Sequence, residues 1–263
     1  MLLIHNKQVA LFLAFWMVVL TSSCEGLKTE QSIKADLRDH NVKTRNAALA
    51  LLVPYAERGN NQWAIDKVRE ILMTGPKEDR IQMLSYIGGM GNQEKYFEKD
   101  VVHVLNDNDP EIRTTGIIAL EMIKPKDSSS LEALLNLLND NNDEVRLQCF
   151  TTLQRVSHDT RVIKALIGAL INEPKESLRS NYVLIFLNYE GYLDNYIDDF
   201  IILLSDPNQP YVYDILFLLG RLGNKASKAL ESIRQLAQSK DERLRQAAEE
   251  AIRNIERLNE SPR

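Results

Sequence analysis

The chain has 263 residues, of which 44% are hydrophobic and 26% charged, an ordinary composition for a globular protein with a sizeable core. Its formal net charge at pH 7 is −5, and no two lysines or arginines are adjacent after residue 23, so the sequence argues against a nucleic-acid partner, which usually requires a basic patch. The two cysteines, Cys24 and Cys149, provide no disulfide framework.

The N-terminal segment differs from the rest of the chain. Val9–Leu20 is an unbroken apolar run that follows a lysine and is shorter than the roughly 20 residues of a membrane span. Small residues come next, so the pattern predicts a cleaved export signal over residues 1–23.

The end of this segment, Leu20–Cys24, resembles a bacterial lipobox, although its leucine lies four residues before the cysteine and the lipobox leucine usually lies three before. The resemblance implies a lipid on the Cys24 thiol, a tether over residues 24–30, and a membrane-anchored lipoprotein that faces the periplasm or the cell surface. An ordinary secreted protein and an uncleaved anchor are the alternatives.

Arginine recurs through the remainder of the chain with a period near 33 residues. The positions are Arg45, Arg80, Arg113, Arg146, Arg179 and Arg245. Tyr213 lies where the missing member of the series is expected. A fixed period of this size indicates stacked structural repeats.

Each arginine lies on an expected helix with apolar residues at helical spacing, and a second apolar helix precedes it. Clear examples of the preceding helix are Leu131–Leu138, Val162–Ile171 and Ile197–Leu204. The short turns between the two helices are rich in Asp, Asn and Pro, which favour helix starts. The sequence therefore predicts an all-α fold, an α-solenoid of about seven helix-turn-helix repeats over residues 31–258, with a C-terminal tail at 259–263.

An acidic residue often stands six positions before the arginine, and we expect the two to form a ladder within and between repeats. The pairs are Asp39 with Arg45, Asp107 with Arg113, Asp140 with Arg146, and Glu173 with Arg179. Thr74 and Ser239 replace the acid before Arg80 and Arg245. We expect the ladder to be interrupted at these two repeats and at Tyr213.

This combination of helix pairs with an Asp and Arg ladder resembles the HEAT-repeat family. The segments Ile87–Asn92 and Leu219–Asn224 resemble the end of the second helix in the phycobilisome-lyase-type subgroup of HEAT-like repeats. The subgroup implies one alternative function, an enzyme or enzyme subunit related to bilin lyases.

No residue pattern points to catalysis, a metal site or a cofactor. His40, His103 and His158 fall in different repeats without a neighbour at ligand spacing. The Asp-rich turns at Asp107 and Asp140 lack the glycine at position six and the glutamate at position twelve of a calcium loop. We therefore predict no enzyme, no metal and no cofactor.

An aromatic segment, Tyr182–Phe217, departs from the repeat and contains six of the nine tyrosines. Tyr189 and Tyr192 fall at a connection between helices, and together with Tyr213 they are the candidate partner-binding residues, because tyrosine is enriched at binding hot spots. The alternative is a locally aromatic core. The sequence favours a protein-binding scaffold or adaptor in the bacterial envelope; a structural component of an envelope assembly is a further alternative.

Overall fold

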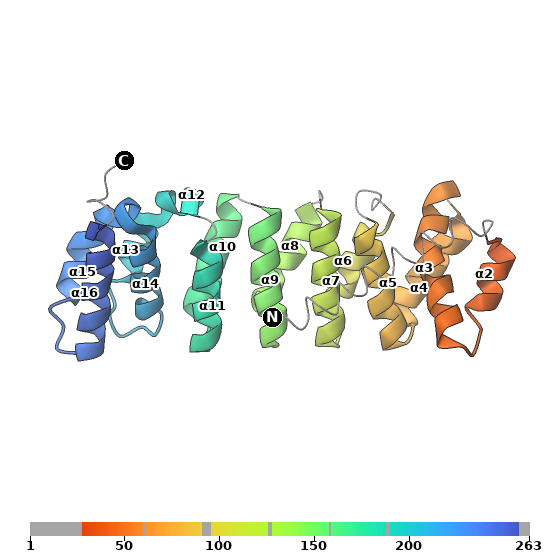
Figure 1. The fold of residues 1–263 in the computed structure, drawn as a ribbon, viewed down its shortest axis with the longest axis horizontal. Helices are drawn as coiled ribbons and strands as arrows, with labels where there is room; N and C mark the ends of the chain where they lie inside the picture. Colours follow the sequence, from red (N-terminus) through yellow and green to blue (C-terminus); the bar gives the residue numbers. More distant parts are fainter. Residues whose placement is uncertain are drawn as a thin grey trace. The chain divides into compact units, whose positions relative to one another are not determined.

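The structure is a computed structural model that describes residues 28–59, 61–90, 96–125, 128–157, 159–187 and 190–257. Every regular element in these ranges is a helix and none is a strand, so the predicted all-α fold is confirmed (Figure 1). The expected signal peptide, Cys24, His158, Tyr189 and the C-terminal tail lie outside the described residues.

The chain divides into two compact units, the first ending at Val156 and the second beginning at Ser157. The first unit contains four helix pairs. They are α2 (Glu30–Asp36) with α3 (Val42–Gly59), α4 (Gln62–Thr74) with α5 (Lys77–Gly89), α6 (Glu98–Val104) with α7 (Pro110–Ile123), and α8 (Ser128–Leu137) with α9 (Asp143–Val156).

The second unit contains three more pairs. They are α10 (Thr160–Asn172) with α11 (Glu176–Phe186), α13 (Ile197–Leu203) with α14 (Val212–Leu222), and α15 (Leu230–Leu236) with α16 (Glu242–Arg257). Short helical segments precede two of these pairs: α12 (Glu190–Leu193) and η3 (Asp194–Tyr196) lead into α13, and η4 (Gly223–Ala229) leads into α15.

Polar side chains in the turns start the helices. The Asn61 side chain accepts a hydrogen bond from the Ala64 N–H at 3.0 Å, and the Asp109 carboxylate accepts one from the Glu111 N–H at 2.9 Å. Both bonds satisfy N–H groups that have no partner inside the helix, and Pro110 at the first position of α7 has no N–H to satisfy.

The second helices of successive pairs pack directly on one another within each unit: α3, α5, α7 and α9 follow in order in the first, and α11, α14 and α16 in the second (Figure 1). Glycine permits the closest approaches. A Cβ atom on Gly88 of α5 would lie 3.1 Å from the Ala119 Cα of α7, and one on Gly220 of α14 would lie 3.2 Å from the Ala251 Cα of α16.

The apolar stripes predicted for the helices form the core of each unit. Phe97 and Phe150 are fully buried in the first unit, and Phe186 and Phe200 in the second. Within the described ranges, no helix combines the length and the apolar composition needed to cross a bilayer.

Candidate functional site

The periodic arginines bind the turn that precedes their own helix through its backbone. In five repeats Nη1 of the arginine donates to the carbonyl oxygen six residues earlier. The pairs are Arg45 with Asp39 (3.0 Å), Arg113 with Asp107 (2.7 Å), Arg146 with Asp140 (2.9 Å), Arg179 with Glu173 (2.9 Å) and Arg245 with Ser239 (3.2 Å). Because a backbone carbonyl accepts this bond, any residue can supply it, and Ser239 binds Arg245 as the acidic residues bind the other arginines.

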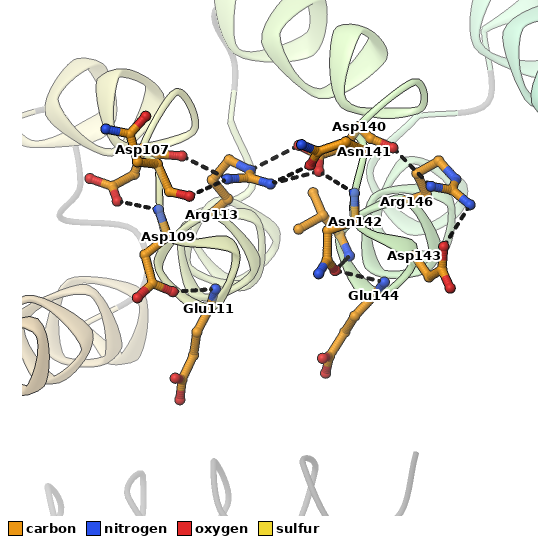
Figure 2. A network of polar contacts seen from close by, with 12 residues as sticks. Asp107, Asp109, Glu111, Arg113, Asp140, Asn141, Asn142, Asp143, Glu144 and Arg146 are labelled. Carbon is orange, nitrogen blue, oxygen red and sulfur yellow. Dashed lines mark hydrogen bonds and ion pairs between the residues drawn. The ribbon is translucent and has the colours of Figure 1, made fainter.

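The carboxylates of two of these turns, Asp107 and Asp140, make a different contact, with the arginine of the preceding repeat, and Figure 2 shows this contact for Asp140. Nε and Nη2 of Arg113 donate to the Asp140 carboxylate at 2.8 and 2.6 Å. Arg80 pairs with Asp107 through Nη2 alone, because its Nε donates to the Leu72 carbonyl. The ladder between repeats therefore joins residues 27 positions apart.

Each of these carboxylates also fixes the shape of its own turn. Asp107 accepts a hydrogen bond from the Asp109 N–H at 2.8 Å, and Asp140 accepts one from the Asn142 N–H at 2.8 Å (Figure 2). Asn142 in turn accepts from the Glu144 N–H at 2.9 Å and starts α9. One aspartate thus shapes the turn and holds the neighbouring repeat.

The pairing expected between Asp140 and Arg146 needs correction. The Asp140 carboxylate binds Arg113, and only the Asp140 carbonyl binds Arg146. Nη2 of Arg146 donates instead to Asp143, at 2.9 Å (Figure 2). The Asp140 carboxylate is occupied by Arg113 and by the Asn142 N–H, so only its carbonyl serves Arg146.

The second unit keeps the ladder at the repeat where the sequence predicted an interruption. Nε of Arg179 donates to Asp214 at 2.9 Å, so the residue after Tyr213 supplies the carboxylate. Burial raises the pKa of Asp214, against the lowering effect of the Arg179 hydrogen bond. The Tyr213 ring is half-buried, and the Arg243 guanidinium lies 4.7 Å from its centre, a cation–π contact.

The aromatic segment contributes to both core and surface. Tyr182 and Tyr196 are buried, whereas Tyr192 is 45% exposed. Large apolar side chains that the sequence did not single out are also exposed in this unit: Leu184 (55%), Ile202 (67%) and Phe217 (50%). Leu184 and Phe217 lie on α11 and α14, which pack against each other.

A groove of about 600 Å³ lies in the first unit, where the ladder lacks a carboxylate. Its lining residues are Lys34, Leu37, Arg38, Arg45, Leu49, Trp63, Lys67, Glu70, Ile71, Thr74, Gly75, Pro76 and Asp79. We call it the first-repeat groove. The sequence signal for it was Thr74, which stands where the later repeats have an aspartate.

The turn beside Thr74 is also built differently from the later ones. Helix α4 continues to Thr74, and the Thr74 hydroxyl donates to the Glu70 carbonyl at 3.0 Å. Nε of Arg80 donates to the Leu72 carbonyl at 2.7 Å, eight residues upstream. Thr74 therefore offers no charge to Arg45 of the preceding repeat.

Neither histidine in the described ranges, His40 or His103, belongs to a group suited to a metal: the side chains there form no cluster of three or more His, Cys, Asp or Glu that could hold an ion. Cys149 is buried, and its thiol donates to the Leu134 carbonyl at 2.7 Å. Burial raises the pKa of this thiol well above its ordinary value.

Helix pairs stacked through their second helices, with an arginine ladder along the turns, define an α-solenoid. The sequence matches the family described as HEAT repeats over residues 65–154 and 98–184. The two matches together span residues 65–184, which are therefore similar to HEAT repeats.

Solved structures of this class are similar to the chain. Importin beta is 16% identical, with a TM-score of 0.52, over 88% of this chain and 36% of that one, which shows a shared fold. The complex of CpcE and CpcF of phycocyanin lyase from Nostoc sp. PCC7120 is 17% identical over 88% and 96% of the two chains, with a TM-score of 0.44.

A designed armadillo repeat protein in complex with the peptide (KR)4 is 17% identical over 86% of this chain and 100% of that one, with a TM-score of 0.37. No curated protein matches the sequence.

Proposed function

We propose that this protein is an exported, lipid-anchored scaffold or adaptor that binds a protein partner in the bacterial envelope. The observation that supports binding most directly is the exposed apolar surface of the second unit. Leu184 and Phe217, on neighbouring helices α11 and α14, are each about half exposed. If these side chains form one exposed apolar patch, such a patch is typical of interaction sites, and the capture experiment below tests it.

The fold supports the same proposal. Stacked helix pairs present successive helices along one face, which suits an extended partner. Tyr192 and Tyr213 lie in the same unit as Leu184 and Phe217, and we propose them as contributors to the partner site, Tyr213 together with the Arg243 guanidinium that covers its ring. Aromatic and arginine side chains dominate hot spots because they combine large contact area with a polar or charged group.

Export and anchoring are supported by the apolar run and the lipobox-like segment that ends at Cys24. Only the cysteine thiol can accept the lipid, so we expect Cys24→Ser to release the protein from the membrane fraction or to block its maturation. A Cys149→Ser variant is the matched control. Wild-type migration and fractionation of Cys24→Ser would exclude lipidation.

Binding is tested by affinity capture from detergent-solubilised membranes, with the protein partner identified by its mass. We expect Phe217→Ser and Tyr192→Ala to reduce its recovery while helicity, measured by circular dichroism, stays at the wild-type level. Glu231→Ser, on the exposed part of α15, is the control and should recover the partner normally. Equal recovery by all variants would reject this surface as the binding site.

The proposal is a binding role and assigns no catalytic residue, metal or cofactor. The alternative, an enzyme of the bilin-lyase type, is tested by mixing a bilin with the purified protein. We expect its absorbance spectrum to stay unchanged, and a new absorbance band that survives denaturation would favour an enzyme of the lyase type.

A further inference from the structure

We infer that the first-repeat groove binds an acidic peptide segment, and that an aspartate or glutamate of this segment takes the place of the missing ladder carboxylate beside Arg45. The inference rests on the proposed protein-binding function, because the segment would belong to the protein partner. It assigns a chemical class to that partner: a chain with carboxylates beside apolar residues.

The arginine ladder itself defines the vacant position. In Arg113, Nη1 binds the carbonyl of its own turn, while Nε and Nη2 hold the Asp140 carboxylate of the next repeat at 2.8 and 2.6 Å. In Arg45, Nη1 likewise binds the carbonyls of Asp39 (3.0 Å) and His40 (3.5 Å). The Nε and Nη2 groups of Arg45 have no acceptor among the residues that the structure describes. They form the same edge that binds the Asp140 carboxylate in Arg113.

The charge of the groove favours an anion. Four cations line it, Lys34, Arg38, Arg45 and Lys67, against two carboxylates. Lys34 pairs with Glu30 at 2.5 Å and Lys67 with Glu70 at 2.7 Å. Over the described ranges, Arg38 and Arg45 have no carboxylate partner. Two arginines in a chain of net charge −5 therefore bring positive charge to this groove that no described carboxylate neutralises.

The walls of the groove suit a peptide. Leu37, Leu49 and Ile71 provide apolar surface, and Trp63 provides an aromatic face that Lys34 Nζ approaches to 4.5 Å from the ring centre. Sites that combine apolar walls with a few placed charges are typical of ligand binding, and volumes of about 300–1,000 Å³ are usual for them. A peptide in which carboxylates stand beside apolar residues would match the apolar walls and the positive charges of this groove.

Asp79 also lies at the groove, and its negative charge weakens the binding of any anion there. The planar edge formed by Nε and Nη2 of an arginine matches the two oxygens of a carboxylate.

Trp63 provides a direct readout. The sequence has two tryptophans, Trp16 and Trp63, so the tryptophan fluorescence of the full chain with Trp16→Phe comes from the groove alone. The probes are a six-residue peptide of alternating Asp and Leu, the same peptide with Asn for Asp, and inorganic phosphate. We expect a saturable fluorescence change with the Asp peptide that weakens with added salt, and binding that is about tenfold or more weaker with the Asn peptide.

Three variants in this background test the residues. Thr74→Asp supplies a carboxylate from the chain itself, which should bind Arg45 and abolish the fluorescence change with the Asp peptide. Thr74→Ser supplies no charge and should respond like the parent. Asp79→Asn should bind the Asp peptide more tightly. A parent protein that does not respond, an equal response to the Asp and Asn peptides or to phosphate, or an unchanged response in Thr74→Asp would overturn the inference.

Different results would reject the peptide-binding inference and the proposed partner-binding function. If membranes yield a partner that Thr74→Asp recovers normally, the groove is not its binding site and the binding function stands. If membranes yield no partner, the proposed function fails, and the peptide titration still decides whether the groove recognises carboxylates.

Discussion

Arg113 and Asp140 belong to successive repeats and form a two-pronged ion pair whose side chains are only 9% and 8% exposed. A buried pair of this kind is costly to break, because removal of one partner leaves the other charged and unsolvated. Arg113 also donates to the carbonyls of Asp107 and Asn108, so one guanidinium connects two turns. The stacking of the repeats depends on such contacts as well as on the apolar core.

We expect Arg113→Ala to lower the free energy of unfolding by about 3 kcal/mol or more, since Asp140 would be left buried without its partner. Arg155→Ala is the matched control. Arg155 also pairs across repeats, with Glu121 at 2.6 Å, but its side chain is half exposed, so its loss should cost about 1 kcal/mol or less. Urea denaturation measures both values, and similar midpoints for the two variants would contradict a structural role for the buried ladder.

Glycine at the helix contacts gives a second prediction. Gly168→Ala in α10 should stabilise the protein by roughly 0.5–1 kcal/mol, because outside the adjacent residues and the backbone of its own helix no atom lies within 4 Å of the new Cβ atom, and alanine favours helix. Gly220→Ala should lose this gain or destabilise, since its Cβ atom would press on the Ala251 backbone at 3.2 Å. Melting temperatures that rise equally in both variants would show that α14 and α16 are less closely packed than described.

Asp214 gives a pH-dependent prediction. Burial raises its pKa in the folded state, so the folded state holds this proton more tightly than the unfolded chain does. The free energy of unfolding therefore falls as the pH rises from the pKa of Asp214 in the unfolded chain, near 3.8, to its higher pKa in the folded state. Above the folded-state pKa, the contribution of Asp214 is fully lost. Relative to Asp214→Asn, the wild type should lose stability over this window. An Asp214 pKa at or below that of free aspartate, measured by NMR, would mean that Arg179 outweighs burial.

The buried thiol gives a fourth prediction. In a Cys24→Ser variant Cys149 is the only cysteine, and because burial raises its pKa the reactive thiolate is disfavoured. We expect a thiol reagent to react very slowly with the native protein at pH 8 and completely after denaturation. Rapid reaction with the native protein would place Cys149 at an accessible position.

The repeats could be predicted from the sequence, but the contacts between successive repeats could not. The spacing of the arginines and the apolar stripes predicted the helix pairs, because both depend on residues close together in the chain. The partner of each arginine depends on how one repeat lies on the next. Residue spacing therefore predicts a pairing of Asp140 with Arg146, whereas the Asp140 carboxylate binds Arg113, and spacing does not identify Asp214, beside Tyr213, as the partner of Arg179.

The candidate sites, like the ladder, could be predicted from the sequence only in part. Thr74 was recognisable as a departure from the ladder, but its consequence, a groove with two arginines free of carboxylate partners in the described ranges, requires α2, α3, α4 and α5 to meet. The aromatic segment was recognisable by composition, whereas its division into buried Tyr182 and exposed Tyr192 depends on the orientation of each helix.

The most direct test of partner binding is photocrosslinking in intact cells, with benzoylphenylalanine in place of Phe217 on α14. Because Phe217 is half exposed, the aromatic replacement fits there without disturbing the core. We expect ultraviolet light to produce one adduct of discrete mass at this position and none with the same replacement at Glu231, an exposed residue of α15. The absence of an adduct at position 217, or identical adducts at both positions, would contradict a specific partner on this surface.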